Sequence, residues 1–210
     1  MKSSKYLIIL SVLIVILIIP FMANAVEDDN RFYTNVKAGV YIPFDRQSNA
    51  SYDTGISTEF SAGYHIFPSF TVEAGVGYFK TQITIDQSNA DGSVDVSVIP
   101  LTLAAKWINN YERSSFYLGG GIGAYYEMID GEVDMSSSGT FKFDDQVVDF
   151  GVHVLFGFLY NLSQNVQLGL EWRPMYIIDT EFESTNSFGT ATLKPDLGGR
   201  LLSGVLSVRF

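Results

Sequence analysis

Hydrophobic and polar residues alternate along most of this chain with a period of two, which is typical of β-strands. In the segment NVQLGLEW, for example, every second residue from Val166 to Trp172 is apolar. The period of about 3.6 that marks an amphipathic helix fits nowhere after residue 25. Eight alternating runs occur, at residues 33–44, 54–66, 69–85, 93–108, 115–129, 146–160, 165–180 and 197–210. The pattern therefore predicts an all-β fold with eight long strands.

The lengths of these runs and of their connections indicate a barrel that crosses a membrane. Each run exceeds the usual five or six residues of a strand, and roughly 9 to 11 residues suffice for a tilted strand to span a bilayer. Short turns (FPS, NNYERS and NLSQN) alternate with longer polar connections. Tight turns at one end and longer loops at the other are typical of outer-membrane barrels. We expect four external loops, centred on residues 45–53, 86–92, 130–145 and 180–196.

The polar face decides between a membrane barrel and a soluble barrel with an apolar interior. Gly and Ser dominate this face, with only isolated charges, whereas a water-exposed exterior carries Lys and Glu at high density. A narrow eight-stranded interior instead needs small residues and a few paired charges. The apolar face also carries aromatic residues near strand ends, including Trp107, Phe116, Tyr160 and Trp172, as an interfacial girdle does. We therefore predict an eight-stranded antiparallel up-and-down transmembrane β-barrel.

The first 25 residues have the features of an export signal. Lys2 and Lys5 form a short basic start, residues 7–22 are apolar, and the sequence ANA at residues 23–25 is a small-residue cleavage pattern. We accordingly divide the chain into three parts. They are a cleaved signal peptide at residues 1–25, a short periplasmic segment at residues 26–32, and the barrel at residues 33–210.

Charge and cysteine content exclude several function classes. Of the 13 Lys and Arg residues, two lie in the signal, so 11 remain against 23 Asp and Glu. Such an acidic chain argues against nucleic-acid binding, which needs a basic surface. The absence of cysteine excludes disulfides and thiolate metal sites. We expect neither a cofactor nor a metal.

The segments VIPLTLAAKW and FYLGGGIGAYY and the C-terminal strand resemble recurrent strands of one superfamily. It comprises the small eight-stranded outer-membrane barrels of Gram-negative bacteria, of the OmpX-like and OmpA transmembrane-domain type, and the resemblance covers residues 32–210. It implies export to the outer membrane and contact with outer-membrane lipids and lipopolysaccharide, and we expect a monomer. It also implies that the barrel-assembly machinery reads the last strand as an insertion signal. The residues in that role are Leu202, Gly204, Leu206, Val208 and Phe210.

Charged residues on the polar face are expected to point into the barrel. A carboxylate in a narrow interior is costly unless it is paired, and acids and bases on this face are nearly balanced. We therefore predict a structural network of ion pairs and hydrogen bonds, with Arg209 also pointing inward. The expected members are Lys37, Glu59, His65, Glu73, Lys106, Glu127, Asp149, His153, Glu171 and Arg173.

The sequence favours a non-enzymatic protein that supports envelope integrity, or that binds an external ligand or surface through its loops. A narrow channel for ions or small hydrophobic solutes stays open as an alternative, because the many glycines could leave internal voids, although eight strands leave little room. Acidic residues between 130 and 145 could bind Ca²⁺ weakly or bridge to lipopolysaccharide phosphates, but a solvated acidic loop is the simpler interpretation.

A lipid-modifying enzyme is the less favoured alternative. Asp149 and His153 lie four residues apart on one strand, about 13 Å at roughly 3.3 Å per residue, so they cannot form a hydrogen bond directly. No Gly-x-Ser-x-Gly pattern nominates a nucleophile.

Overall fold

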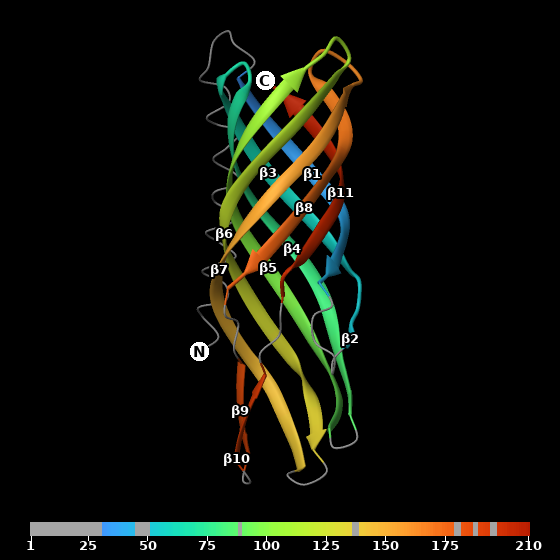
Figure 1. Ribbon diagram of the computed structural model, residues 1–210, viewed down its shortest axis with the longest axis vertical. Helices are drawn as coiled ribbons and strands as arrows, with labels where there is room; N and C mark the ends of the chain where they lie inside the picture. Colours follow the sequence, from blue (N-terminus) through green and yellow to red (C-terminus); the bar gives the residue numbers. More distant parts are fainter. Residues whose placement is uncertain are drawn as a thin grey trace.

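Eight long strands pair in a closed antiparallel ring (Figure 1). The structure, a computed structural model, describes residues 31–44, 51–87, 90–135, 139–178, 182–186, 189–193 and 197–210. The ring strands are β1 (Phe32–Pro43), β3 (Gly55–Phe67), β4 (Phe70–Gln87), β5 (Ala90–Asn110), β6 (Ser114–Met135), β7 (Gly139–Asn161), β8 (Val166–Ile177) and β11 (Gly199–Arg209). Each pairs with the next, and β11 returns to pair with β1. The predicted eight-stranded antiparallel barrel is confirmed.

Three short strands accompany the barrel. β2 (Ser51–Tyr52) pairs with the outer part of β4, while β9 (Phe182–Asn186) and β10 (Gly189–Leu193) form a separate two-stranded hairpin. The sequence pattern did not predict these strands. The proposed signal peptide at residues 1–25 lies outside the described residues. Within the described part of the chain, no helix is long and apolar enough to cross a membrane.

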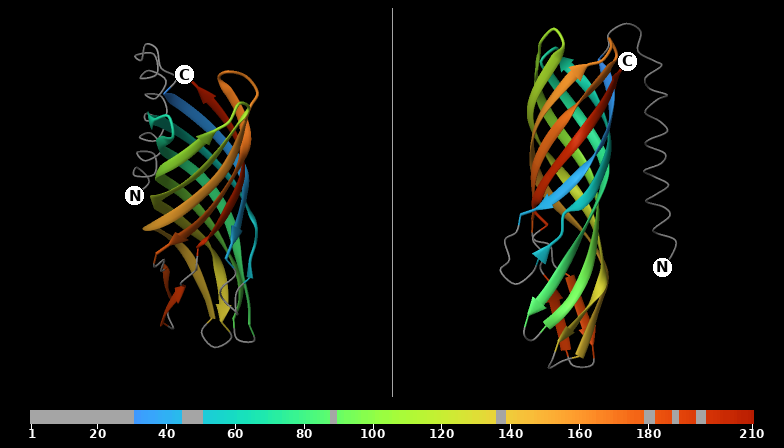
Figure 2. Two further views of the ribbon diagram at one scale, coloured as in Figure 1. Left: turned by 45° about the horizontal axis from the view of Figure 1, so that its top comes forward. Right: turned by 90° about the vertical axis from the view of Figure 1, so that its right-hand side faces the viewer.

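Strands β4 to β7 continue well beyond the barrel body on the side of the long connections (Figures 1 and 2). Two of the four predicted loops are therefore wrong. Residues 86–92 fall largely in β4 and β5, and residues 130–145 fall largely in β6 and β7. We call the part of β4 to β7 beyond the barrel body the extension, and we take its end as extracellular because the tight turns lie at the other end.

The extension forms because the apolar face of these strands changes sides. In the barrel body, Leu101 and Leu103 of β5 face outward and are about half exposed. Farther along the same strand Val94 and Val96 are completely buried inside, and Asp95 between them is polar. The sheet thus presents apolar side chains to lipid in one half and polar side chains to water in the other. Apolar side chains therefore face outward where lipid surrounds the barrel, and inward where water surrounds it.

Acidic residues predicted to form a loop lie instead on the paired strands of the extension. Glu132 and Asp134 belong to β6, and Asp144 and Asp145 belong to β7. Lys142 donates a hydrogen bond of 2.6 Å to Glu132, which raises the pKa of Lys142. Among the described residues, no group of three His, Asp or Glu side chains is arranged to hold a metal ion.

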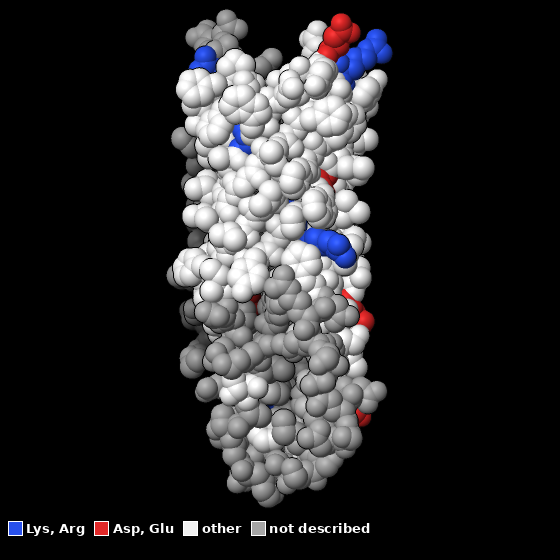
Figure 3. Space-filling model, in the orientation of Figure 1, with Lys and Arg blue, Asp and Glu red and all other residues white. Residues whose placement is uncertain are grey.

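On the face of the barrel body seen in Figure 3, most of the described surface is uncharged and only a few charged groups appear. Large apolar side chains on several strands point outward and stay 50–70% exposed, among them Ile56, Trp107, Ile122, Phe150 and Leu170. An apolar belt of this kind is stable only against hydrocarbon. The predicted orientation, with the apolar face toward lipid, agrees with this exposure.

The last strand closes the ring. β11 pairs along its length with β1 on one side and with β8 on the other. Leu202, Leu206 and Phe210 point outward, with 43–50% of each side chain exposed, while Ser203 and Ser207 are buried inside. The alternation expected of an insertion signal is thus present at Leu202, Gly204, Leu206, Val208 and Phe210. Their recognition by the assembly machinery stays a prediction.

Candidate functional site: a buried charge cluster and a break in the barrel wall

Six charged side chains meet in the middle of the barrel, and each belongs to the predicted interior network. All of them are buried, with at most 9% exposure. Three are basic and three are acidic, so the group is neutral when all six are ionised. We call this group the charge cluster; it comprises Lys37 of β1, Glu59 of β3, Glu73 of β4, Lys106 of β5, and Glu171 and Arg173 of β8.

Lys37 is the centre of the charge cluster. Its Nζ lies 2.9 Å from Glu59 Oε1, 3.0 Å from Glu73 Oε1 and 3.0 Å from Glu171 Oε1. One ammonium group therefore holds three carboxylates. Glu59 lies on β3, the neighbour of β1, whereas Glu73 of β4 and Glu171 of β8 each lie two strands away on opposite sides, so the contacts also brace the barrel across its lumen.

The other two cations complete the charge cluster. Arg173 donates hydrogen bonds to both carboxylate oxygens of Glu59, and one of 2.6 Å to Glu171. Lys106 Nζ lies 2.5 Å from Glu73 Oε2 and 4.7 Å from the centre of the Tyr117 ring.

Two tyrosines satisfy the remaining acceptors. The Tyr33 hydroxyl donates to Glu73 and the Tyr117 hydroxyl donates to Glu171, each at 2.8 Å. Ion pairs with this many hydrogen bonds offset the cost of removing the charges from water. The charge cluster therefore acts as a plug across the interior.

The remaining four predicted network residues are not joined to the charge cluster by these contacts. His65 lies near the periplasmic end of β3, where its Nδ1 makes a 2.8 Å hydrogen bond with Thr71 Oγ1. Glu127 is completely buried on β6, and Asp149 is half-buried on β7. His153 is buried, and within the described part of the chain neither ring nitrogen has a hydrogen-bond partner. No hydrogen bond therefore links His153 to Asp149, as the spacing predicted.

Replacing His153 with leucine is expected to stabilise the barrel. Leucine has a similar volume and no polar atom to leave unsatisfied, and a buried unsatisfied group costs about 1–3 kcal/mol. Urea unfolding of the refolded protein should show a gain of about 1 kcal/mol or more. The control is His65→Leu, which removes a formed hydrogen bond and should not stabilise. A loss of stability in the His153 variant would show that the ring makes an essential polar contact.

An apolar cluster fills the interior on the extracellular side of the charge cluster. Tyr41 and Phe79 stack there with their ring centres 4.4 Å apart, and both are at most 1% exposed. Residues from β1, β4 to β9 and β11 contribute to it. Its main members are Tyr41, Phe79, Ile83, Val94, Val96, Val98, Tyr125, Ile129, Val133, Phe141, Phe143, Met175 and Ile177. We call this group the apolar interior. A polar interior is the rule for barrels of this type, and the sequence analysis did not predict this exception.

The hydrogen-bonded ladder between β4 and β5 is broken where the charge cluster and the apolar interior meet. Paired positions run as far as Val76 with Leu101 and resume at Phe79 with Val98. Pro100 lies in this gap and has no N–H group to donate, and Gly77 opposite it has no side chain to fill the space. We call this gap the wall break.

A cavity of about 10 Å³, enough for at most one water molecule, lies at the wall break. It is lined by Thr58 and Tyr78, which are exposed on the outside, and by Glu59 and Phe79, which are buried inside. Phe79 belongs to the apolar interior and Glu59 to the charge cluster. The cavity therefore lies between the lipid-facing side of the wall and the junction of both groups.

A second gap in the ladder is filled by larger side chains than the wall break. Pro174 interrupts the pairing of β7 with β8 between His153 and Phe156. There, however, Leu155 and Arg173 point inward and are at most 3% exposed, so large side chains fill the gap. At the wall break the buried ring of Pro100 takes this place, with its Cγ 3.2 Å from where a Cβ on residue 77 would lie.

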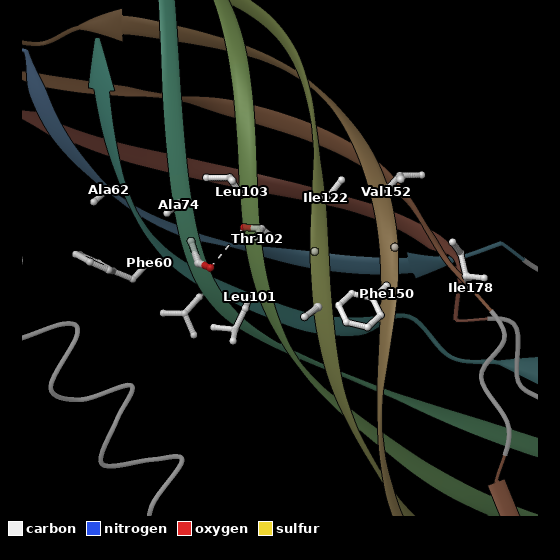
Figure 4. Close-up of a pocket in the computed structure, with 15 residues that line it drawn as sticks. Phe60, Ala62, Ala74, Leu101, Thr102, Leu103, Ile122, Phe150, Val152 and Ile178 are labelled. Carbon is white, nitrogen blue, oxygen red and sulfur yellow. Dashed lines mark hydrogen bonds between the residues drawn. The ribbon is translucent and has the colours of Figure 1, made fainter. Parts of the chain in front are cut away.

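A groove of about 690 Å³ lies on the outer wall close to the wall break (Figure 4). Small residues form its floor, including Ala62, Ala74 and Gly123, and Phe60 and Phe150 stand beside them. Val76 and Leu101, the last pair before the wall break, also line it. The wall break thus adjoins a lipid-facing groove that is almost entirely apolar.

A closed antiparallel ring with a lipid-facing wall defines an integral outer-membrane β-barrel protein. Comparison with protein families agrees: residues 11–198 match the outer membrane protein beta-barrel domain, and the chain belongs to that family. The protein is therefore located in the outer membrane of a Gram-negative bacterium, as predicted.

Similar solved structures share the fold. The outer membrane protein OprG from Pseudomonas aeruginosa has a TM-score of 0.66 at 17% identity, with 86% of this chain and 96% of that chain covered. A major outer membrane protein from Thermus thermophilus has a TM-score of 0.58 at 13% identity, with 86% and 98% covered. Comparison with curated proteins found no match.

Proposed function

We propose that this barrel takes up small hydrophobic molecules from the cell exterior and releases them sideways into the outer membrane. The observation that carries the proposal is the position of the wall break. It lies where the apolar interior ends and the charge cluster begins, and it opens beside the apolar groove. A molecule that descends the apolar interior therefore meets a charged barrier below and an exit to lipid at its side.

The lining of this route favours neutral, apolar solutes over ions. Val94, Val96 and Ile129 offer no group that could replace the hydration of an ion. The charge cluster blocks the way to the periplasm, because its six side chains are paired with one another and buried. We therefore infer a route with one aqueous end and one lipid end, without a catalytic step.

A role in envelope integrity or in binding at the cell surface is the second candidate. It is supported by the close packing of the apolar interior, in which Tyr41, Phe79 and Tyr125 are at most 1% exposed. A packed interior suits a rigid, closed barrel that displays its extension outside the cell. The proposed uptake route requires these side chains to move apart as a solute passes.

Uptake of the apolar dye N-phenyl-1-naphthylamine separates these two functions. The dye fluoresces when it enters phospholipid, so cells that produce the barrel should show a several-fold faster rise in fluorescence than cells with an empty vector. The control is a hydrophilic probe of similar size, whose entry should stay unchanged because the charge cluster blocks the lumen. Equal dye uptake with and without the protein would rule out the route and leave the surface role.

A further inference from the structure

The periplasmic mouth of the barrel holds a separate cavity on the opposite side of the charge cluster from the apolar interior. Its volume is about 590 Å³, and Arg209, His65 and Asn110 are among the residues that line it. A smaller cavity, which Arg209 and His65 also line, extends inward as far as Lys106. The mouth is thus a polar recess that ends at the charge cluster.

Arg209 and Arg31 both line this recess, and no Asp or Glu is among its described lining residues, so it has an excess of positive charge. Arg209 points inward, as predicted, and is half-buried. Within the described part of the chain, its guanidinium group has no ion pair with any carboxylate. The nearest acids of the charge cluster are already engaged, because Glu73 pairs with Lys37 and Lys106, and Glu171 pairs with Lys37 and Arg173.

The strand pairing brings the other polar groups of the recess close to Arg209. Arg209 lies directly across from Tyr33 of β1, whose hydroxyl donates to Glu73. The Tyr33 ring lies 5.2 Å from the ring of His65, and Thr71 holds His65 Nδ1 at 2.8 Å. An arginine without an acidic partner therefore stands beside a fixed imidazole, within a cavity large enough for a small anion.

We propose that the periplasmic mouth binds a phosphate group through Arg209, with His65 as a further polar contact. A planar guanidinium matches the oxygen atoms of a phosphate in a two-pronged contact, and a half-buried site strengthens this interaction relative to water. The phosphate can belong to inorganic phosphate in the periplasm or to the headgroup of a phospholipid in the inner leaflet, because both present the same kind of oxygen atoms to the guanidinium. This site is independent of the uptake route.

Nuclear magnetic resonance of the refolded protein in a maltoside detergent tests the proposal. Inorganic phosphate is added in one titration, dihexanoylphosphatidylglycerol in a second, and dihexanoylglycerol, which lacks the phosphate, in a third. We expect saturable shifts of the Arg209 and His65 backbone amides with at least one phosphate-bearing probe and none with dihexanoylglycerol. The probe that produces them identifies the source of the phosphate.

Variants separate binding at this site from general attraction to a basic surface. Arg209→Gln should weaken the apparent affinity for the phosphate probe at least about tenfold. Arg209→Lys should have a smaller effect, because lysine keeps the positive charge but cannot donate two parallel hydrogen bonds. Arg113→Gln is the matched control, since Arg113 is exposed on a periplasmic turn and does not line the cavity. The proposal is overturned if no phosphate probe produces saturable shifts, or if Arg209→Gln binds as tightly as Arg113→Gln. Heat-modifiable gel mobility verifies that each variant is folded, and Arg209→Lys serves if Arg209→Gln does not refold.

Discussion

Lys37→Met is expected to lower the free energy of unfolding of the barrel by about 3–5 kcal/mol, which is the usual cost of removing one partner from a buried ion pair. The side chain keeps its length but loses the charge that holds Glu59, Glu73 and Glu171 at 2.9–3.0 Å. Arg173 and Lys106 then face three carboxylates, so one negative charge stays buried without compensation. This loss is large because neither water nor a new partner can reach the middle of the lumen easily.

Urea unfolding in lipid vesicles, followed by tryptophan fluorescence and by gel mobility, measures this effect. The control is Lys142→Met, which breaks an exposed pair with Glu132 and should change the stability little, because water screens that pair. Adding Glu171→Gln to Lys37→Met should recover part of the lost stability, since the double variant has one carboxylate fewer to compensate. Equal stabilities of the wild type and Lys37→Met would mean that the charge cluster does not hold the barrel together.

Much of the charge cluster could be predicted from the sequence, because a period of two fixes which side of a strand each residue faces. Lys37, Glu73 and Lys106 stand on the Gly- and Ser-rich face, and the barrel turns that face inward. The sequence does not predict which of these charged residues contact one another. Lys37 meets Glu171, 134 positions away, because the order and stagger of the strands around the ring bring both to the same height.

The extension and the wall break were missed although the sequence contains signals for both. Val94, Val96 and Val98 alternate in the opposite phase to Leu101 and Leu103, and this reversal marks the point where the outside of the barrel passes from lipid to water. The prediction assumed one apolar face for each run and therefore overlooked the reversal. As a result, the predicted strands stop short of the extension. Pro100 within a predicted strand was a signal for an interrupted ladder. That Gly77 lies opposite Pro100 follows only from the register of β4 with β5.

A disulfide across the wall break is expected to abolish most of the dye uptake that the barrel supports. The chain has no cysteine of its own, so the pair Gly77→Cys and Pro100→Cys can form only one bond. A Cβ atom on residue 77 would lie 3.2 Å from Cγ of Pro100, which brings the two positions within reach of a disulfide. It would also lie 2.9 Å from the backbone oxygen of Thr58, so β3 must move slightly to admit the new side chain. The bond would tie β4 to β5 and place two sulfur atoms in the cavity that Thr58, Tyr78 and Phe79 line.

Uptake of N-phenyl-1-naphthylamine by cells, measured before and after a reductant, tests this closure in a single variant. Under oxidising conditions the rate should fall close to that of cells with an empty vector, and reduction should restore it, because only the bond differs between the two states. The matched control is Val72→Cys with Ala105→Cys, a paired position farther along the same two strands, where the ladder is intact and neither residue lines the groove or the cavity. A bond there ties the same two strands without filling the cavity, so uptake should persist. If both disulfides reduce uptake equally, the solute needs the strands to separate along their length, and the wall break is not its exit.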